Sequence, residues 1–81
     1  MLILREEKII DNDNIIGSKI RQIRLVKGIG QIELVKQLQF MDVDITREIL
    51  VKIETGKQHI KLEQFKKIKK LLYTNYEELL N

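Results

Sequence analysis

The chain contains no cysteine, no proline and no tryptophan, and only one histidine and four glycines among 81 residues. Without cysteine, the sequence excludes disulfides and thiolate metal sites and fits an intracellular protein. A single imidazole excludes zinc sites that need two histidines. No apolar stretch approaches the ~20 residues that cross a bilayer, so we expect no membrane segment. The lack of proline and the few glycines favour an all-helical chain.

What is present fits one small folded domain. Apolar residues make up 43% of the 81 residues, which allows one compact core. The formal net charge of +3 permits binding to nucleic acid or another anionic surface without requiring it. We therefore expect a cytoplasmic protein, and no pattern in the sequence indicates a cofactor.

The first 13 residues are expected to form an extension outside the main domain. Leu2, Ile3 and Leu4 could form a short strand. Alternatively, one face of a helical turn could equally carry Leu2, Arg5, Ile9 and Ile10. The polar cluster at residues 11–14 marks a boundary. The simplest interpretation is an extension that packs on the domain. A strand that forms a dimer and an arm that reaches DNA are the alternatives.

Residues 14–81 are predicted to form the main domain, with helices at about 15–27, 31–40, 45–55, 61–72 and 75–80. Gly28 ends the first helix, Thr46 can cap the third, and Gly56 suits the left-handed residue that ends it. The second and third helices have the pattern of a helix-turn-helix. In such a motif the second of the two helices enters the major groove of DNA.

Four residues predict how the helices pack. Gly17 lies inside the first helix at a cost of about 1 kcal/mol relative to alanine, so we expect another element to pack closely against it. Arg24 lies near the apolar stripe of that helix rather than opposite it, so we expect a partly buried cation with a partner. Phe40 and Val43, at the connection between the second and third helices, are expected in the core.

An ordered set of residues runs from the first helix to the end of the chain. It comprises Ile16, Gly17, Ile20, Arg24, Gly28, Gln31, Glu33, Leu34, Leu38, Ile45, Thr46, Arg47, Leu50, Ile53, Glu54, Gly56, Lys57, Phe65, Ile68, Leu72, Glu78, Leu79 and Leu80. At these spacings the chain resembles the lambda-repressor/Cro-like helix-turn-helix family, also called the XRE family. Three positions depart from the family pattern. Lys69 stands where a small core residue is usual, and Asp42 and Tyr73 stand where glycine is frequent.

The resemblance implies a compact five-helix, all-α domain that binds a specific sequence of double-stranded DNA through its third helix. It implies base contacts from Arg47, Glu48, Val51 and Lys52, phosphate contacts from Gln31 and Thr46, and an ion pair between Arg24 and Glu54. Lys57 and Lys61 are further candidates for phosphate contacts, because they follow the third helix in the chain.

We expect a transcriptional regulator, most simply a repressor, that acts as a homodimer because one module of this size makes few base contacts. The apolar C-terminus also favours a dimer. The alternative is a protein-interaction module, such as an antitoxin that binds a toxin, with DNA binding secondary; Ile49 and Val51 add apolar surface to the third helix. We expect no enzyme, because no nucleophile–base pair, phosphate-binding glycine loop or metal cluster is visible. His59 is expected to be an exposed or phosphate-contacting loop residue.

Overall fold

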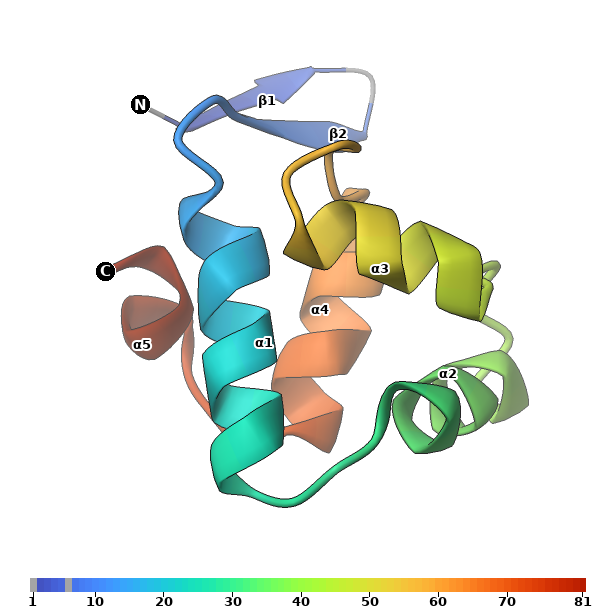
Figure 1. Cartoon of the computed structure of the whole chain (residues 1–81). Helices are drawn as coiled ribbons and strands as arrows, with labels where there is room; N and C mark the ends of the chain where they lie inside the picture. Colours follow the sequence, from blue (N-terminus) through green and yellow to red (C-terminus); the bar gives the residue numbers. More distant parts are fainter. Residues whose placement is uncertain (1, 6) are drawn as a thin grey trace.

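The computed structural model describes residues 2–5 and 7–81. In this part of the chain a hairpin, β1 (Leu2–Arg5) and β2 (Lys8–Asp11), precedes five helices: α1 (Ile15–Val26), α2 (Gln31–Phe40), α3 (Arg47–Glu54), α4 (Leu62–Leu71) and α5 (Tyr76–Leu80). The five predicted helices are present, and their ends differ from the predicted ones by at most two residues. Helix α3 packs against α1 and α2, α4 packs against α2, and α5 packs against α1 (Figure 1).

The expectation of an all-α chain is wrong at the N-terminus, where β1 and β2 form a two-stranded antiparallel sheet. The hairpin packs on the domain through β2. Ile9 is buried, and its N–H donates to the Ile60 carbonyl oxygen at 2.8 Å. The N–H of Leu62 donates to the Glu7 carbonyl oxygen at 2.7 Å. These backbone bonds, together with β-branched side chains, favour a strand over the alternative helical turn.

One apolar core lies between the helices and is closed by the hairpin and α5. Its members come from every helix and from the connecting segments: Ile9, Ile16, Ile20, Leu34, Val35, Leu38, Val43, Ile45, Leu50, Ile53, Ile60, Phe65, Ile68, Leu72 and Leu79. None of the helices in the described part of the chain combines the length and the hydropathy that a membrane crossing requires. The burial of this core is the main source of stability in a domain of this size.

The expectation that Phe40 lies in the core is wrong, whereas Val43 is buried as expected. Phe40 is 91% exposed. It follows the core residue Leu38 by two positions, and two positions on an α-helix correspond to about 200° of rotation. Phe40 therefore points away from the side of α2 that packs on the core. The chain returns to the core after α2 ends, where the Val43 N–H donates to the Leu38 carbonyl oxygen at 3.0 Å.

Two of the three departures from the family pattern adopt the left-handed conformation that glycine would adopt. Asp42 has φ 63° and Tyr73 has φ 51°. Such a conformation costs a non-glycine residue roughly 1–2 kcal/mol, although aspartate tolerates it better. Gly28 and Gly56, predicted to end α1 and α3, have φ 70° and 79°. The turns after all four of these helices therefore share one backbone geometry, with glycine at only two of them.

The third departure, Lys69, is half-buried at the contact between α4 and α5. Its ammonium lies 4.8 Å from the centre of the Tyr76 ring, within the range of a cation–π interaction. The same ring lies 5.2 Å from that of Phe65. The long lysine side chain thus covers the aromatic contact where a small residue was expected.

The start of α1 is held by Asp11 rather than by Asn14, which occupies the N-cap position without making a capping bond. The two carboxylate oxygens of Asp11 accept from the N–H groups of Ile15 and Ile16, at 2.9 and 2.6 Å. The Asn14 side chain instead donates to the Glu54 carbonyl oxygen at 3.2 Å. This bond joins the beginning of α1 to the end of α3.

Close packing at Gly17 is confirmed. A Cβ atom there would overlap the Ile53 carbonyl oxygen and the Asn14 Oδ1 atom, so α1 and α3 approach each other through backbone atoms. We predict that Gly17→Ala lowers the free energy of unfolding by about 1–3 kcal/mol, the usual cost of overpacking. Urea or thermal unfolding followed by circular dichroism measures this loss.

Gly30→Ala is the matched control, because no atom lies within 4 Å of a Cβ built there. It should cost under about 1 kcal/mol, the effect of alanine at a helix N-cap. Equal losses in the two variants would contradict the packing interpretation.

Candidate functional site

Helix α3 presents a polar outer face. The Thr46 hydroxyl oxygen accepts from the Ile49 N–H at 3.2 Å and so caps the helix, as predicted. Leu50 and Ile53 point into the core, and Glu54 is also buried. The four residues expected to contact bases lie on the remaining face. Arg47, Glu48 and Lys52 are exposed, and Val51 is half-buried.

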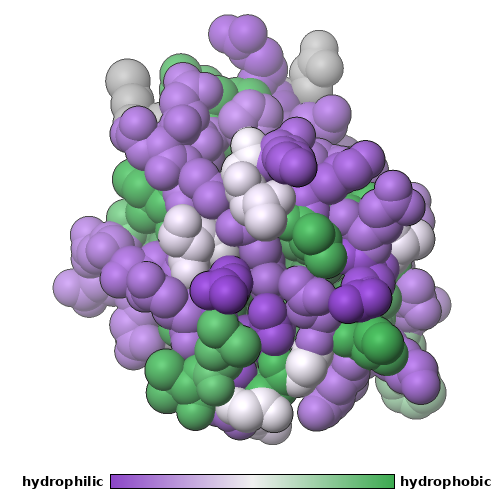
Figure 2. All heavy atoms as spheres, in the orientation of Figure 1, coloured by the Kyte–Doolittle hydropathy of each residue, from purple (hydrophilic) through white to green (hydrophobic). Residues whose placement is uncertain are grey.

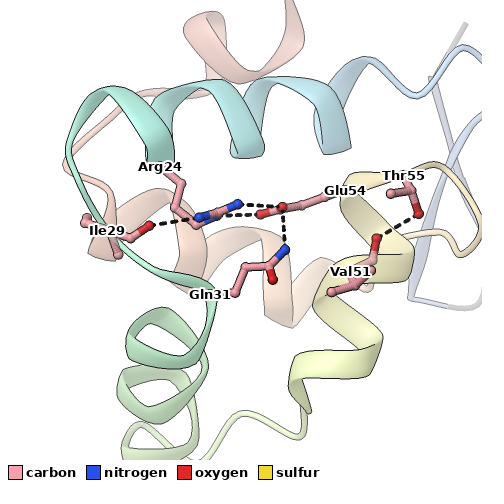
Figure 3. A network of polar contacts seen from close by, with 6 residues as sticks. All are labelled: Arg24, Ile29, Gln31, Val51, Glu54 and Thr55. Carbon is pink, nitrogen blue, oxygen red and sulfur yellow. Dashed lines mark hydrogen bonds and ion pairs between the residues drawn. The ribbon is translucent and has the colours of Figure 1, made fainter.

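Arg24 and Glu54 form the expected ion pair (Figure 3). Arg24 Nε donates to Glu54 Oε2 at 2.8 Å, and Arg24 Nη2 donates to Glu54 Oε1 at 2.9 Å. The two side chains are 7% and 1% exposed. This bidentate geometry matches the planar guanidinium to the carboxylate. It fixes the end of α1 against the end of α3 inside the domain.

Two further bonds join the start of α2 to this pair. Arg24 Nη1 donates to the Ile29 carbonyl oxygen at 3.0 Å, and Gln31 Nε2 donates to Glu54 Oε1 at 3.1 Å. Gln31, expected to contact a phosphate, is therefore half-buried and already oriented by Glu54. Its amide nitrogen carries a second hydrogen that remains able to donate. Among the described side chains, no buried polar atom lacks a hydrogen-bond partner.

An open concavity lies where α2 begins, lined by Arg21, Arg24, Gly30, Gln31, Ile32 and Arg47. Gly30 provides no side-chain cap for α2. The first N–H groups of this helix can therefore donate hydrogen bonds to an anion. Arg21 and Arg47 are exposed and add positive charge on two sides. The concavity therefore has the donors and the charge that a phosphate requires.

The sequence prediction did not include Arg21 among the candidate site residues. It precedes Arg24 by three positions, and residues three apart on a helix are neighbours. The implied ion pair between Arg24 and Glu54 of α3 therefore also brought Arg21 close to that helix. That spacing was the signal available in the sequence.

On the outer face of α3, Glu48 and Lys52 are four residues apart, and their charged atoms lie 3.9 Å from each other. The two side chains are 81% and 48% exposed. Ion pairs in such exposed positions contribute little to stability. Both groups are therefore available for contacts outside the chain. Arg47 lies on the same outer face of α3, and it forms no hydrogen bond or ion pair with any described residue.

The four residues expected to contact phosphates do not all lie together. Gln31 and Arg47 share the concavity at α2, and Thr46 is exposed immediately before α3. Lys57 is exposed in the loop after α3, where its N–H donates to the Lys52 carbonyl oxygen at 2.8 Å. Lys61 lies at the far end of that loop, where it pairs with Lys8 of β2 in an antiparallel bridge.

His59 is half-buried rather than exposed. Its Nδ1 atom accepts from the Asp11 N–H at 3.3 Å, so the ring links the loop after α3 to the end of β2. The described residues contain no group of three or more His, Cys, Asp or Glu side chains that could hold a metal ion. His59 thus has a structural role in the loop.

The face that carries α3 is largely hydrophilic, and its hydrophobic areas are small and separate (Figure 2).

Comparison of the chain with protein-family models, with curated proteins and with solved structures gives no match.

The buried ion pair provides a test of how the two helix ends are held together. Glu54→Gln leaves the Arg24 guanidinium buried without a counter-charge, which costs about 3–5 kcal/mol. We expect the double variant Arg24→Met/Glu54→Leu to be more stable than Arg24→Met or Glu54→Leu alone. The reason is that an apolar pair of similar volume can replace a buried ion pair at little cost in stability. Urea unfolding of the wild type, Arg24→Met, Glu54→Leu and the double variant measures the coupling, and the same measurement on Glu54→Gln gives the cost of the unpaired cation.

Glu48→Ala serves as the control because its ion pair with Lys52 is exposed. We expect a change within about 0.5 kcal/mol. If the variants at Glu54 and Glu48 are equally stable, the buried pair does not hold the helices.

Proposed function

We propose that the chain is a sequence-specific regulator of transcription, most simply a repressor, that binds double-stranded DNA with α3 in the major groove. The observation that carries the proposal is the outer face of α3, where Arg47, Glu48 and Lys52 are exposed and Arg47 has no described partner. The concavity with Arg21 and Gln31 lies next to Arg47. Base-reading and phosphate-binding groups are thus adjacent.

The order of the helices and the Arg24–Glu54 pair agree with what the resemblance to the XRE family implies. The bidentate pair holds α3 against α1, and the bond from Gln31 joins α3 to the start of α2. A rigid helix-turn-helix is needed because side chains must reach the base edges in one defined register. This support comes from the geometry of the chain itself.

Each exposed side chain of α3 has a suitable target in the major groove. Arg47 can donate two hydrogen bonds to guanine O6 and N7, and Glu48 can accept from cytosine N4. The half-buried Val51 can contact a thymine methyl group. Lys52 can reach a base or a phosphate. Such contacts discriminate between sequences, whereas phosphate contacts from Gln31, Thr46, Lys57 and Lys61 supply salt-sensitive affinity.

We further propose that two copies bind DNA together, on half-sites about 34 Å apart. The small number of side chains on α3 that can reach bases supports this proposal. The apolar C-terminus supports it less than the sequence suggested, because Leu79 is fully buried and Tyr76 packs on Phe65 within one chain. A cytoplasmic regulator of this kind needs neither a cofactor nor catalysis.

Selection from a random duplex library at about 0.1 M salt, where electrostatic attraction is only partly screened, tests the proposal. We expect enrichment of a two-fold symmetric motif. Arg47→Ala should weaken binding to this motif by about 1–3 kcal/mol and relax the preference at one base position in each half-site.

Lys70→Ala removes one positive charge from the exposed side of α4 and serves as the control. It should leave the selected motif unchanged. Enrichment of a single half-site would retain DNA binding and refute the dimer. If selection with the wild-type chain enriches no sequence motif, the proposed function is contradicted.

A specific observation also supports the second candidate, a protein-interaction module such as an antitoxin that binds a toxin. Phe40 is 91% exposed and borders a surface depression with Lys36, Gln37, Met41 and Leu71. This apolar area lies at the end of α2 opposite the concavity with Arg21. Exposed aromatic side chains beside apolar depressions are frequent in protein interfaces.

Phe40→Ser separates the two functions. For a DNA-binding function we expect unchanged affinity for the selected duplex and unchanged stability, because an exposed side chain contributes little to the core. Fluorescence anisotropy with labelled duplex measures the affinity. Loss of a co-purified partner in the Phe40→Ser protein, with full DNA binding, would show that the chain has both functions.

A further inference from the structure

Three cations lie in a row across the hairpin and the segment that follows α3. Arg5 of β1 pairs with Lys8 of β2, and Lys8 pairs with Lys61. We call Arg5, Lys8 and Lys61 the cation row. All three are exposed. Residues directly opposite in antiparallel pairs have Cβ atoms only about 4.5–5.5 Å apart.

The three side chains project from the same side of the sheet. Ile9 is buried beneath the hairpin, and successive side chains on a strand point to opposite faces. Lys8 therefore points away from the core. Arg5 and Lys61 are directly paired with Lys8, and paired residues share a face. The whole row thus faces outward.

No carboxylate among the described residues forms an ion pair with a member of the cation row. Like charges directly opposite each other destabilise an antiparallel pair. Glu7 and Glu63 line a neighbouring concavity together with Lys61, but neither forms an ion pair with a member of the row in the described part of the chain. Folding therefore brings together three exposed cations, and none of them forms an ion pair with a carboxylate of residues 2–5 or 7–81.

We propose that the cation row binds the phosphate backbone of the same duplex whose major groove α3 enters. This inference rests on the proposed DNA-binding function and extends its interface to the N-terminal hairpin. The row spans roughly 10 Å, or two spacings between neighbouring strands. That span corresponds to about three steps between successive phosphates, because phosphates rise ~3.4 Å per nucleotide along one DNA strand.

The position of the row fits this contact. The loop that follows α3 carries Lys57 and leads to Lys61, and the hairpin lies beside this loop (Figure 1). Ile60 anchors the loop to Ile9 and is 3% exposed. The hairpin is therefore fixed relative to α3, and its cations lie beyond the C-terminal end of that helix, beside the loop that carries Lys57.

The test is the salt dependence of binding to a labelled mixed-sequence DNA duplex of about 30 base pairs, roughly three helical turns. The variant Arg5→Gln/Lys8→Gln should reduce the slope of log K against log salt concentration by about 1.8, or 0.9 for each lost phosphate contact. Its affinity at about 0.1 M salt should fall at least roughly tenfold.

The control variant Lys36→Gln/Lys70→Gln removes the same two charges. Both lysines are exposed, and Lys36 borders Leu71 at the opposite end of α4 from Lys61. This variant should keep the slope of the wild-type protein. Thermal unfolding of both variants without DNA checks the fold. Arg5→Gln/Lys8→Gln should unfold at the same or a higher temperature at low salt, because it removes repulsion.

An unchanged slope in Arg5→Gln/Lys8→Gln would overturn the inference alone, provided that Arg47→Ala still weakens binding. Equal losses of slope in the two double variants would also overturn it, because only net charge would then matter. A shift from dimer to monomer in sedimentation, with the slope unchanged, would assign the row to a contact between copies. Absence of duplex binding by the wild-type chain would overturn both the inference and the proposed function.

Discussion

The ion pair between Arg24 and Glu54 is the interaction on which the arrangement of α1, α2 and α3 depends. It joins the end of α1 to the end of α3, and Gln31 and the Ile29 carbonyl group bring the start of α2 to the same point. Because both side chains are almost fully buried, the pair is strong only while all its partners are in place. The angle of α3 therefore depends on a polar contact inside an otherwise apolar core.

The backbone contact between α1 and α3 complements this ion pair. The absence of a side chain at Gly17 lets the Ile53 carbonyl group approach α1, and Asn14 closes the same junction by a bond to Glu54. One end of α3 is thus fixed on two sides, by backbone packing and by charge. Its outer face has few internal partners, which leaves Arg47 and its neighbours available to a ligand. Rigid support beneath an exposed polar face is the arrangement that sequence-specific recognition requires.

Much of the fold could be predicted from the sequence, because local signals and burial agree for most elements. Helical periodicity located all five helices, Thr46 and Gly56 marked the ends of α3, and the position of Arg24 indicated a buried partner. The prediction failed where short segments depend on distant ones. The hairpin forms because β2 bonds to residues around Ile60, far along the chain. Phe40 was misplaced for a local reason: it lies about 200° around α2 from the core residue Leu38, so the helix turns it toward solvent.

The sequence by itself determined the helices, the core residues of α2 and α3 and the polar character of α3, because these follow from periodicity and from capping chemistry within a few residues. Apart from the Arg24–Glu54 pair, which the resemblance implied, only the tertiary structure decided which charges meet. Arg21 shares a concavity with Arg47, and Arg5 and Lys8 align with Lys61. Such groupings arise when segments distant in the chain pack together, and charge interactions depend on separations in space rather than along the sequence.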